Sequence, residues 1–254
     1  MKTGQKEIKI WEGVYKNFKE TGVKNDVFNE EAWVSNSLKK LEKIVRDRSG
    51  NYSENLNQDA LLPLLTASIL STNKKPTVLD FGGGLGISYA QILKSVGKAE
   101  NVKFFIVEKE AVCKAGSKFF KNNKQVIFLN SLPKIKKIDL IHLRSSLQYM
   151  EDWKNVLAKL VEYKPSFFLF IDLFAGNVPT YVTLQNYYGK KIPCQFLNIN
   201  DVIKEMKKNG FEVLYKAPFP STFFCKLSDF PQSNLPTKYR VKNSYNILFF
   251  NKNN

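Results

Sequence analysis

The strongest constraint on the fold is a short apolar run that passes through one carboxylate into a glycine-rich stretch, residues 78–86 (VLDFGGGLG). Glycine has no Cβ, so a loop built from it lets the backbone approach a ligand closely, and helical residues follow from Ile87. The order of strand, glycine loop and helix predicts an α/β fold with a nucleotide-type pocket where the strand ends.

The spacing of the glycines argues against a dinucleotide. A dinucleotide fingerprint reads G-x-G-x-x-G, but the third glycine position falls on Ile87 when counting starts at Gly82 and on Tyr89 when it starts at Gly84. The Asp80 carboxylate at the mouth of the loop would repel a pyrophosphate, and it would attract a ligand that carries an ammonium and a sulfonium. S-adenosylmethionine is such a ligand.

The same residues match a known first motif, which is a hydrophobic strand, an acid and then G-x-G-x-G. Here these positions are Asp80, Gly82, Gly84 and Gly86, with Gly83 as an additional small residue. In this the chain resembles the class I S-adenosylmethionine-dependent methyltransferase superfamily. The resemblance implies a Rossmann-like α/β fold with a mostly parallel seven-stranded sheet, one antiparallel strand and, in this chain, added N-terminal helices.

Two further strands deliver polar residues to the same edge of the sheet. Residues 102–107 end at Glu108, roughly 20 residues beyond the loop, where an acid meets ribose hydroxyls in α/β cofactor sites. The alternative for Glu108 is a solvated carboxylate that opens the next helix. Residues 125–129 lead to Asn130 and Ser131, where the superfamily places contacts to the adenine, although Asn-Ser is also ordinary turn chemistry.

The segment 139–152 (DLIHLRSSLQYMED) resembles the superfamily's fourth motif. The carboxyl ends of parallel strands face the ligand, so we expect Arg144, Ser145, Ser146 and Tyr149 to border the transferred methyl group. Arg144 and Ser145 are therefore predicted contacts of the cofactor.

Methyl transfer to an alcohol would gain from a base that removes the hydroxyl proton. Asp172, which follows the expected strand 167–171, is the first candidate. His142 is the only histidine, but it lies inside the fourth strand, where a packed core histidine is the competing interpretation. Tyr149 is the third candidate, and it reads equally well as an aromatic residue packed under the next helix.

A narrower resemblance covers nearly the whole chain. Trp11-x-Gly13-x-Tyr15, Leu147-Gln148-Tyr149 and the pattern from Gln185 to Asn198 are similar to methyltransferases of bacterial capsule and lipopolysaccharide gene clusters. This implies O-methylation of a sugar hydroxyl, on a nucleotide sugar that serves surface polysaccharide synthesis. The predicted acceptor contacts are Gln185, Asn186, Tyr188, Lys190 and Lys191. Lys190, Lys191 and Arg144 would contact the diphosphate, although each lysine also reads as a solvated surface residue.

The expected domain organisation is one compact unit. Residues 1–75 form an N-terminal helical cap with helices at 30–47 and 59–70, and residues 76–254 form the catalytic domain. The segment of about 176–198 is too long for a tight crossover and too rich in Tyr, Gln and Asn for a core, so we expect a substrate lid. A Pro-rich stretch, 218–236, is expected as a second loop. The remaining helices are expected at 87–97, 110–120, 153–163 and 200–208, and the last strands at 211–217 and 245–250.

Composition adds few constraints. The 254 residues include 43% hydrophobic residues, enough for a large core, and the net charge is +16. Lys and Asn are spread along the chain, as a coding bias would also produce, so the charge by itself is weak evidence for nucleic acid. Cys113, Cys194 and Cys225 show no C-x-x-C spacing, which indicates neither zinc nor a disulfide framework. We expect a cytoplasmic protein without a metal, a signal peptide or a membrane span; a homo-oligomer is left open.

Four other classes of protein fit these residues less well. A nucleic-acid amine methyltransferase would need an Asn/Asp-Pro-Pro-Tyr/Phe motif where this chain has Arg144-Ser145-Ser146-Leu147. A cytosine-carbon methyltransferase would need a cysteine after the fourth strand, whereas Pro193-Cys194 follows the fifth. A non-catalytic partner protein is disfavoured by the intact glycine loop and Glu108. A nicotinamide oxidoreductase is disfavoured by the glycine spacing.

Overall fold

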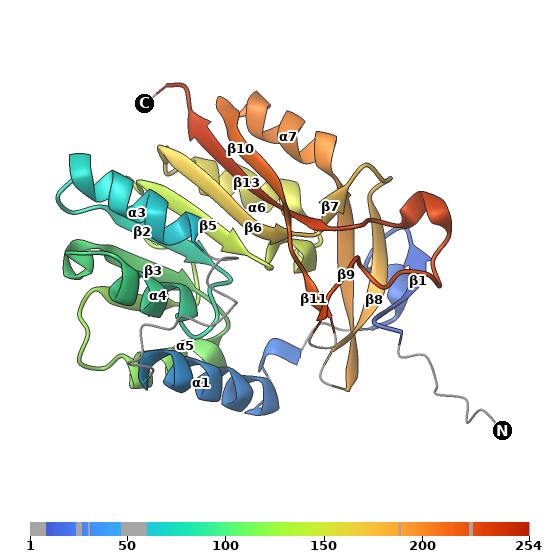
Figure 1. Cartoon of the computed structure of the whole chain (residues 1–254), viewed down its shortest axis with the longest axis horizontal. Coiled ribbons are helices and arrows are strands. Elements are labelled where there is room, and N and C mark those ends of the chain that lie inside the picture. The colour runs from blue at the N-terminus through green and yellow to red at the C-terminus, as the bar shows by residue number, and fades with distance from the viewer. Residues whose placement is uncertain are drawn as a thin grey trace.

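The structure is a computed structural model that describes residues 9–23, 27–29, 31–46, 60–187, 189–223 and 226–253. Figure 1 shows a large twisted sheet flanked by helices, and beside it a second group of strands to which the N-terminal strand belongs. These two parts frame the site described below.

The main sheet has seven strands in the described part of the chain, in the order β10-β13-β6-β5-β2-β3-β4. The chain runs from β2 out to β4 and then returns to β5 on the other side of β2, which makes a topological switch point between β2 and β5. The strands are β2 (Thr77–Phe81), β3 (Lys103–Val107), β4 (Val126–Leu129), β5 (Leu140–Arg144), β6 (Phe167–Leu173), β10 (Phe211–Phe219) and β13 (Ser244–Asn251).

The predicted mostly parallel seven-stranded sheet is confirmed, but antiparallel pairing among the described residues goes beyond the one strand predicted. In the main sheet β13 runs antiparallel to both β6 and β10. A second sheet, which the sequence did not predict, adds further antiparallel pairs between β1 (Trp11–Tyr15), β8 (Tyr181–Tyr187) and β9 (Lys190–Asn198). The short β7 (Ala175–Gly176) pairs in parallel with β9.

Helices cover both faces of the main sheet, which is why its central strands are apolar at nearly every position. Alternate residues of a strand point to opposite faces, so Val78 packs with α3 and α4 while Leu79 packs with α6 and α7. The helices are α1 (Glu31–Arg46), α3 (Leu61–Thr72), α4 (Ile87–Ser95), α5 (Glu110–Phe119), α6 (Trp153–Val161) and α7 (Ile199–Lys208).

The helix boundaries lie within a few residues of their predicted positions. Pro63 occupies the first turn of α3, where a missing amide hydrogen costs nothing. After α4 the left-handed conformation is taken by Lys98, at φ 64°, and not by the neighbouring Gly97. The glycine at the end of α7, Gly210, does take a left-handed φ of 86°.

The N-terminal region is not only a helical cap. β1 pairs with β8, more than half the chain away, before the chain reaches α1. Short 3-10 helices and a two-strand ribbon complete the described elements: η1 (Lys19–Thr21), η2 (Val27–Asn29), η3 (Ala99–Asn101), η4 (Leu147–Tyr149), η5 (Thr237–Tyr239), β11 (Thr222–Phe223) and β12 (Lys226–Leu227).

The segment of about 176–198, expected to be a substrate lid outside the core, is a buried hairpin. Most residues of β8 and β9 are buried, and they pack on an aromatic core that surrounds Trp11. Trp11 is fully buried; its ring stacks on Phe230 at 4.9 Å and meets Phe196 edge-on at 5.7 Å. The expectation that this segment lies outside the core is wrong, because a strand rich in polar residues can still be buried when its alternate residues face a core.

No helix in the described part of the chain combines the length and apolarity that crossing a membrane requires.

Candidate active site

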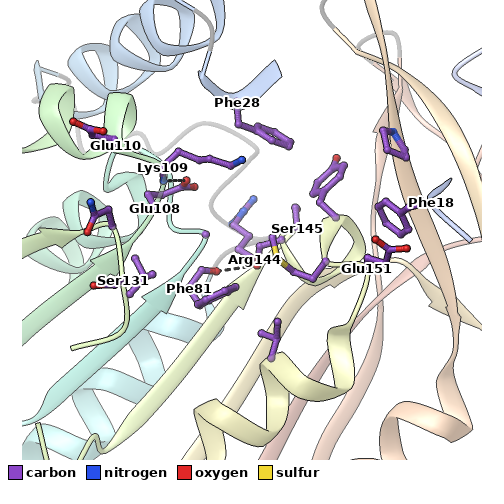
Figure 2. A pocket seen from close by; sticks show the side chains of 18 of the residues that line it. Phe18, Phe28, Phe81, Glu108, Lys109, Glu110, Ser131, Arg144, Ser145 and Glu151 are labelled. Atoms are coloured by element: carbon purple, nitrogen blue, oxygen red, sulfur yellow. Dashed lines mark hydrogen bonds between the residues drawn. The ribbon is translucent and has the colours of Figure 1, made fainter. Parts of the chain in front are cut away.

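A cavity of about 1070 Å³ opens where β2, β3, β4 and β5 end, next to the switch point of the sheet. Figure 2 shows Glu108 and Ser131 on one side, Phe18 and Glu151 on the other, and Arg144 and Ser145 between them. The volume is at the upper end of the roughly 300–1,000 Å³ that one ligand takes, so the cavity has room for two small molecules.

The glycine loop needs glycine at several positions for different reasons. Gly82, Gly84 and Gly86 have φ values of 71°, 57° and 86°, in the left-handed region that other residues rarely adopt. A Cβ on Gly82 would lie 2.5 Å from the Cβ of Ser146, whose hydroxyl donates to the Phe81 carbonyl oxygen at 2.8 Å. Ser146 therefore holds the loop from β5, while the Gly82 amide donates to the Val107 carbonyl oxygen at 2.9 Å and the Gly86 amide to the Gly83 carbonyl oxygen at 3.2 Å.

Asp80 does not lie at the mouth of the cavity. Its side chain is fully buried beneath the loop, and its Oδ1 lies 2.8 Å from Nδ1 of His142 on the neighbouring strand. Its Oδ2 has no hydrogen-bond partner among the described residues, and a Cβ on Gly83 would lie 2.5 Å from that oxygen. The carboxylate supports the loop from below, and direct contact with a positively charged ligand stays a prediction.

Glu108 is placed as the sequence suggested, at the end of β3 and lining the cavity. Its Oε1 accepts from the Gly84 amide at 3.2 Å and its Oε2 from the Lys109 amide at 2.8 Å. Burial raises the pKa of Glu108, with a further rise from Asp80, while the two amides oppose it. Each carboxylate oxygen keeps free lone pairs toward the cavity, as contact with two ribose hydroxyls requires.

The other predicted donor contacts lie around the same cavity. Asn130 and Ser131 line it from the loop after β4, and Arg144 and Ser145 line it from the end of β5. Gly84 has open space on its cavity side, with only the Trp33 ring within 4 Å of its Cβ position, at 3.8 Å. An acid and polar loop residues around one space beside the glycine loop fit an adenosine moiety with a charged tail.

The three candidates for a base are in different positions. His142 is 1% exposed and paired with Asp80, so it does not reach the cavity. Tyr149 lines the cavity and donates to Gln185 at 2.8 Å, but burial raises its pKa well above the ordinary value, which keeps the phenol protonated. Asp172 accepts a hydrogen bond from Ser145 at 2.5 Å and lies near the end of β6, beside the end of β5.

The predicted acceptor contacts lie away from the cavity. Among the described residues, none of Gln185, Asn186, Lys190 and Lys191 lines it, and Tyr188 falls outside the described residues. Lys191 instead pairs with Glu12 of β1 at 2.7 Å, and this contact lowers the pKa of Glu12. Tyr187, next to the turn of the hairpin, and Pro193 are the hairpin residues that line the cavity, and Gln185 is linked to it through the hydrogen bond from Tyr149.

The sequence missed the other half of the lining. An aromatic wall consists of Phe28, Trp33, Tyr149 and Tyr187, and all four line the cavity. Phe28 meets Trp33 at 5.6 Å and Tyr149 at 5.0 Å between ring centroids, both edge-on, and the Trp33 indole donates to the Tyr187 hydroxyl at 3.4 Å. Lys19 and Lys159 add positive charge. Of the four rings the sequence predicted only Tyr149 at the site. Phe28 and Trp33 are close in the chain, but Tyr149 and Tyr187 are far from them and from each other, so no single local motif could have identified the wall.

The cysteines give no sign of chemistry at this site. Cys194, which could have indicated a cysteine nucleophile, is fully buried, and burial raises the pKa of its thiol. Cys113 is a free thiol, and Cys225 lies outside the described residues. Within the described residues no group of three or more His, Cys, Asp or Glu side chains is arranged to hold a metal ion.

Comparison with known protein families identifies this chain. A family described as a methyltransferase domain matches residues 50–216, about two thirds of the chain. Together with the sheet order and the glycine loop, this match defines a class I S-adenosylmethionine-dependent methyltransferase. The chain belongs to the family of methyltransferase domains, and the predicted cofactor, S-adenosylmethionine, agrees with that membership.

Solved structures share the fold at low sequence identity. A 1,6-didemethyltoxoflavin-N1-methyltransferase from Burkholderia thailandensis, with S-adenosylhomocysteine bound, is 13% identical at a TM-score of 0.52, over 90% of this chain and 91% of that one. A magnesium protoporphyrin IX methyltransferase from Synechocystis PCC 6803, with the methyl donor bound, is 12% identical at 0.54, over 91% and 98%. An S-adenosylmethionine-dependent methyltransferase from Clostridium acetobutylicum is 11% identical at 0.53, over 85% and 98%. A comparison with curated protein sequences gave no match.

Proposed function

We propose that this protein transfers a methyl group from S-adenosylmethionine to a hydroxyl oxygen of a small molecule. One observation carries the proposal: a single cavity joins a half suited to the donor, around Glu108 and the glycine loop, to an aromatic and basic half suited to an acceptor. Two ligands that share one cavity can be held with their reacting atoms in contact, which is the main thing this reaction needs.

Each residue on the donor side would contact a different part of the donor. Glu108 would accept from the ribose hydroxyls, Asn130 and Ser131 would meet the adenine, and the glycine loop at Gly82 would let the charged tail approach the backbone closely. The bound donor supplies a methyl group activated by its sulfonium. The chain supplies alignment of the two ligands, exclusion of water by the aromatic wall and acceptance of the hydroxyl proton.

The acceptor half suits a sugar nucleotide with different contacts from those expected. The rings of the aromatic wall offer faces to a nucleobase or a sugar, and Lys19, Lys159 and Arg144 offer positive charge to a diphosphate. A sugar hydroxyl of a nucleotide-activated sugar, used for capsule or other surface polysaccharide, is the proposed acceptor. A cytoplasmic location and a homo-oligomer stay predictions.

The aromatic wall also favours a second candidate, a flat phenolic acceptor. Four rings around one space can hold a planar ring system between them, with its acidic groups toward Lys159. The fold does not choose between the two, because structural neighbours with this fold are named for chemically different substrates.

Two measurements test the proposal in sequence. Calorimetry with S-adenosylmethionine and S-adenosylhomocysteine should show binding, and a screen of nucleotide sugars and planar phenols should show release of S-adenosylhomocysteine with one of them. Donor binding without transfer to either panel would favour a non-catalytic partner protein over an enzyme. Binding of NADH in place of the donor would overturn the proposed class.

Charge reversal separates the two sets of lysines. If a nucleotide sugar is methylated, Lys159→Glu should raise its Michaelis constant, while the double variant Lys190→Glu, Lys191→Glu should leave it unchanged, because those two do not line the cavity. The opposite result would restore the contacts expected from the sequence.

A further inference from the structure

Ser145 and Asp172 form a hydrogen-bonded pair at the edge of the cavity. The Ser145 hydroxyl donates to Oδ2 of Asp172 at 2.5 Å, a short distance typical of an O–H bond to a carboxylate. Among the described residues, Ser145 lines the cavity and Asp172 does not. The serine hydroxyl therefore stands between the space for the acceptor and the carboxylate.

The backbone at both residues is strained. Ser145 has φ 47° and Asp172 has φ 54°, two of only four non-glycine residues with positive φ in the described part of the chain. They follow paired positions of neighbouring strands, since Arg144 pairs with Ile171, and the Ser145 amide donates to the Ile171 carbonyl oxygen at 3.0 Å. Strain at two adjacent strand ends, kept by strong tertiary contacts, is typical of a functional constraint.

Asp172 is fixed from its other side by β13. Ser244, which is fully buried, donates to Oδ1 of Asp172 at 2.5 Å, and the Asp172 amide donates to Oδ1 of Asn246 at 3.1 Å. The Ser221 hydroxyl lies 3.4 Å from that of Ser244. These contacts leave Oδ2 directed at Ser145, so the carboxylate is oriented by groups that are themselves held.

We propose that Ser145 is a catalytic residue that relays the acceptor's hydroxyl proton to Asp172, which acts as a positioning residue and proton store. This inference rests on the proposed function. As the acceptor oxygen bonds to the methyl carbon, the carbon–sulfur bond breaks and its electron pair stays on the sulfur. The acceptor's proton passes to Oγ of Ser145, the serine's own proton passes to Oδ2 of Asp172, and the carboxyl group later returns its proton to solvent.

The other titratable groups near the pair do not offer the same path. Burial and, to a smaller extent, the negative charge of Asp172 raise the pKa of Tyr149, so its phenol stays protonated in the working range. Glu151 lines the cavity as an exposed carboxylate and is the competing base. It serves as the comparison in the test.

The positive φ values of Ser145 and Asp172 decide which substitutions are suitable for the test. Ser145→Gly removes the hydroxyl and also relieves the positive φ, and Asp172→Asn keeps the shape and suits a left-handed φ, so both variants should fold. Each should lower kcat about 10²- to 10⁴-fold while S-adenosylhomocysteine still binds, and each should remove the acidic limb of the pH profile and the solvent isotope effect. Ser244→Ala should keep that limb and shift it to higher pH, because the carboxylate loses one donor.

A second measurement does not depend on the acceptor. Carbon NMR of protein labelled at the aspartate carboxyl carbons should show the titration of Asp172 shifted to higher pH in Ser145→Gly, since a donor to the charged form is lost. An unshifted titration, an acidic limb that survives in Asp172→Asn, or a limb removed by Glu151→Gln would overturn the relay. If the wild type methylates nothing in the screen, the proposed function fails first and the relay with it.

Discussion

The half-buried carboxylate of Glu108 is in an unfavourable place for an acid unless it has a ligand to bind. Burial raises its pKa, so the folded state holds the proton more tightly than the unfolded chain. Stability therefore falls as pH rises from the ordinary glutamate range through the raised value, and the protein carries this cost at neutral pH. Such a cost is typical of a group retained for binding.

Glu108→Gln should separate stability from function. Without the charge, the variant should be as stable as the wild type or more stable at neutral pH, and it should lose about 1.5–3 kcal/mol of donor binding, the value of hydrogen bonds to a charged acceptor. Denaturant unfolding and calorimetry measure the two effects. Glu100→Gln, at an exposed position of η3, is the control and should change neither. Unchanged donor affinity in Glu108→Gln would contradict the assignment.

Gly83 lacks a Cβ because of what lies beneath it. Its added Cβ would lie 2.5 Å from the Asp80 carboxyl group, which is held by His142. Gly83→Ala should therefore displace the loop, lower stability by about 1–3 kcal/mol and weaken donor binding. Gly97→Ala is the matched control, since nothing lies within 4 Å of its Cβ position, and its stability should stay the same or rise slightly. Equal effects at both glycines would contradict this account of the loop.

At the scale of elements, the second sheet builds a wall of the active site. β8 and β9 place Tyr187 and Pro193 against the cavity, and the aromatic core around Trp11 holds them there. The acceptor side of the site thus depends on a strand at the N-terminus.

Trp11→Ala should show this dependence. Loss of a fully buried indole that stacks on Phe230 should cost about 3–5 kcal/mol in denaturant unfolding. Leu64→Ala, at a side chain that is 66% exposed, is the control and should fall within about 0.5 kcal/mol of the wild type. In the surviving folded protein, acceptor affinity should fall more than donor affinity, because the donor side belongs to the main sheet. A fall in donor affinity alone would contradict this division.

At the scale of the whole molecule, the donor site links several strands of the main sheet, so donor binding should stabilise the fold as a unit. At 100 times its dissociation constant a ligand adds about 2.7 kcal/mol, which at about 2–4 °C per kcal/mol for a chain of this size shifts the melting temperature by roughly 5–10 °C. Thermal unfolding with S-adenosylhomocysteine should show this shift, and NADH at the same concentration should show none. The reverse pattern would contradict the cofactor assignment.

The main sheet and the donor side of the site could be predicted from the sequence because their signals are local. The glycine loop, Glu108 and the residues after β4 each follow a strand within a few residues, and parallel strands bring those ends to one edge. The position of the Asp80 side chain could not be predicted in this way. Whether it faces the cavity or lies beneath the glycine loop depends on its contact with His142 of the neighbouring strand.

The sequence by itself determined the class of protein, the strands and helices of the main sheet and the polar residues that line the cavity at the ends of β3, β4 and β5. Only the tertiary structure decided the other side of the cavity, where Phe28 and Trp33 meet the distant Tyr187 and where Lys191 pairs with Glu12. It also brought Ser145 against Asp172. The physical reason is that periodicity and glycine placement act over a few residues, while contacts between distant segments are fixed by how whole elements pack.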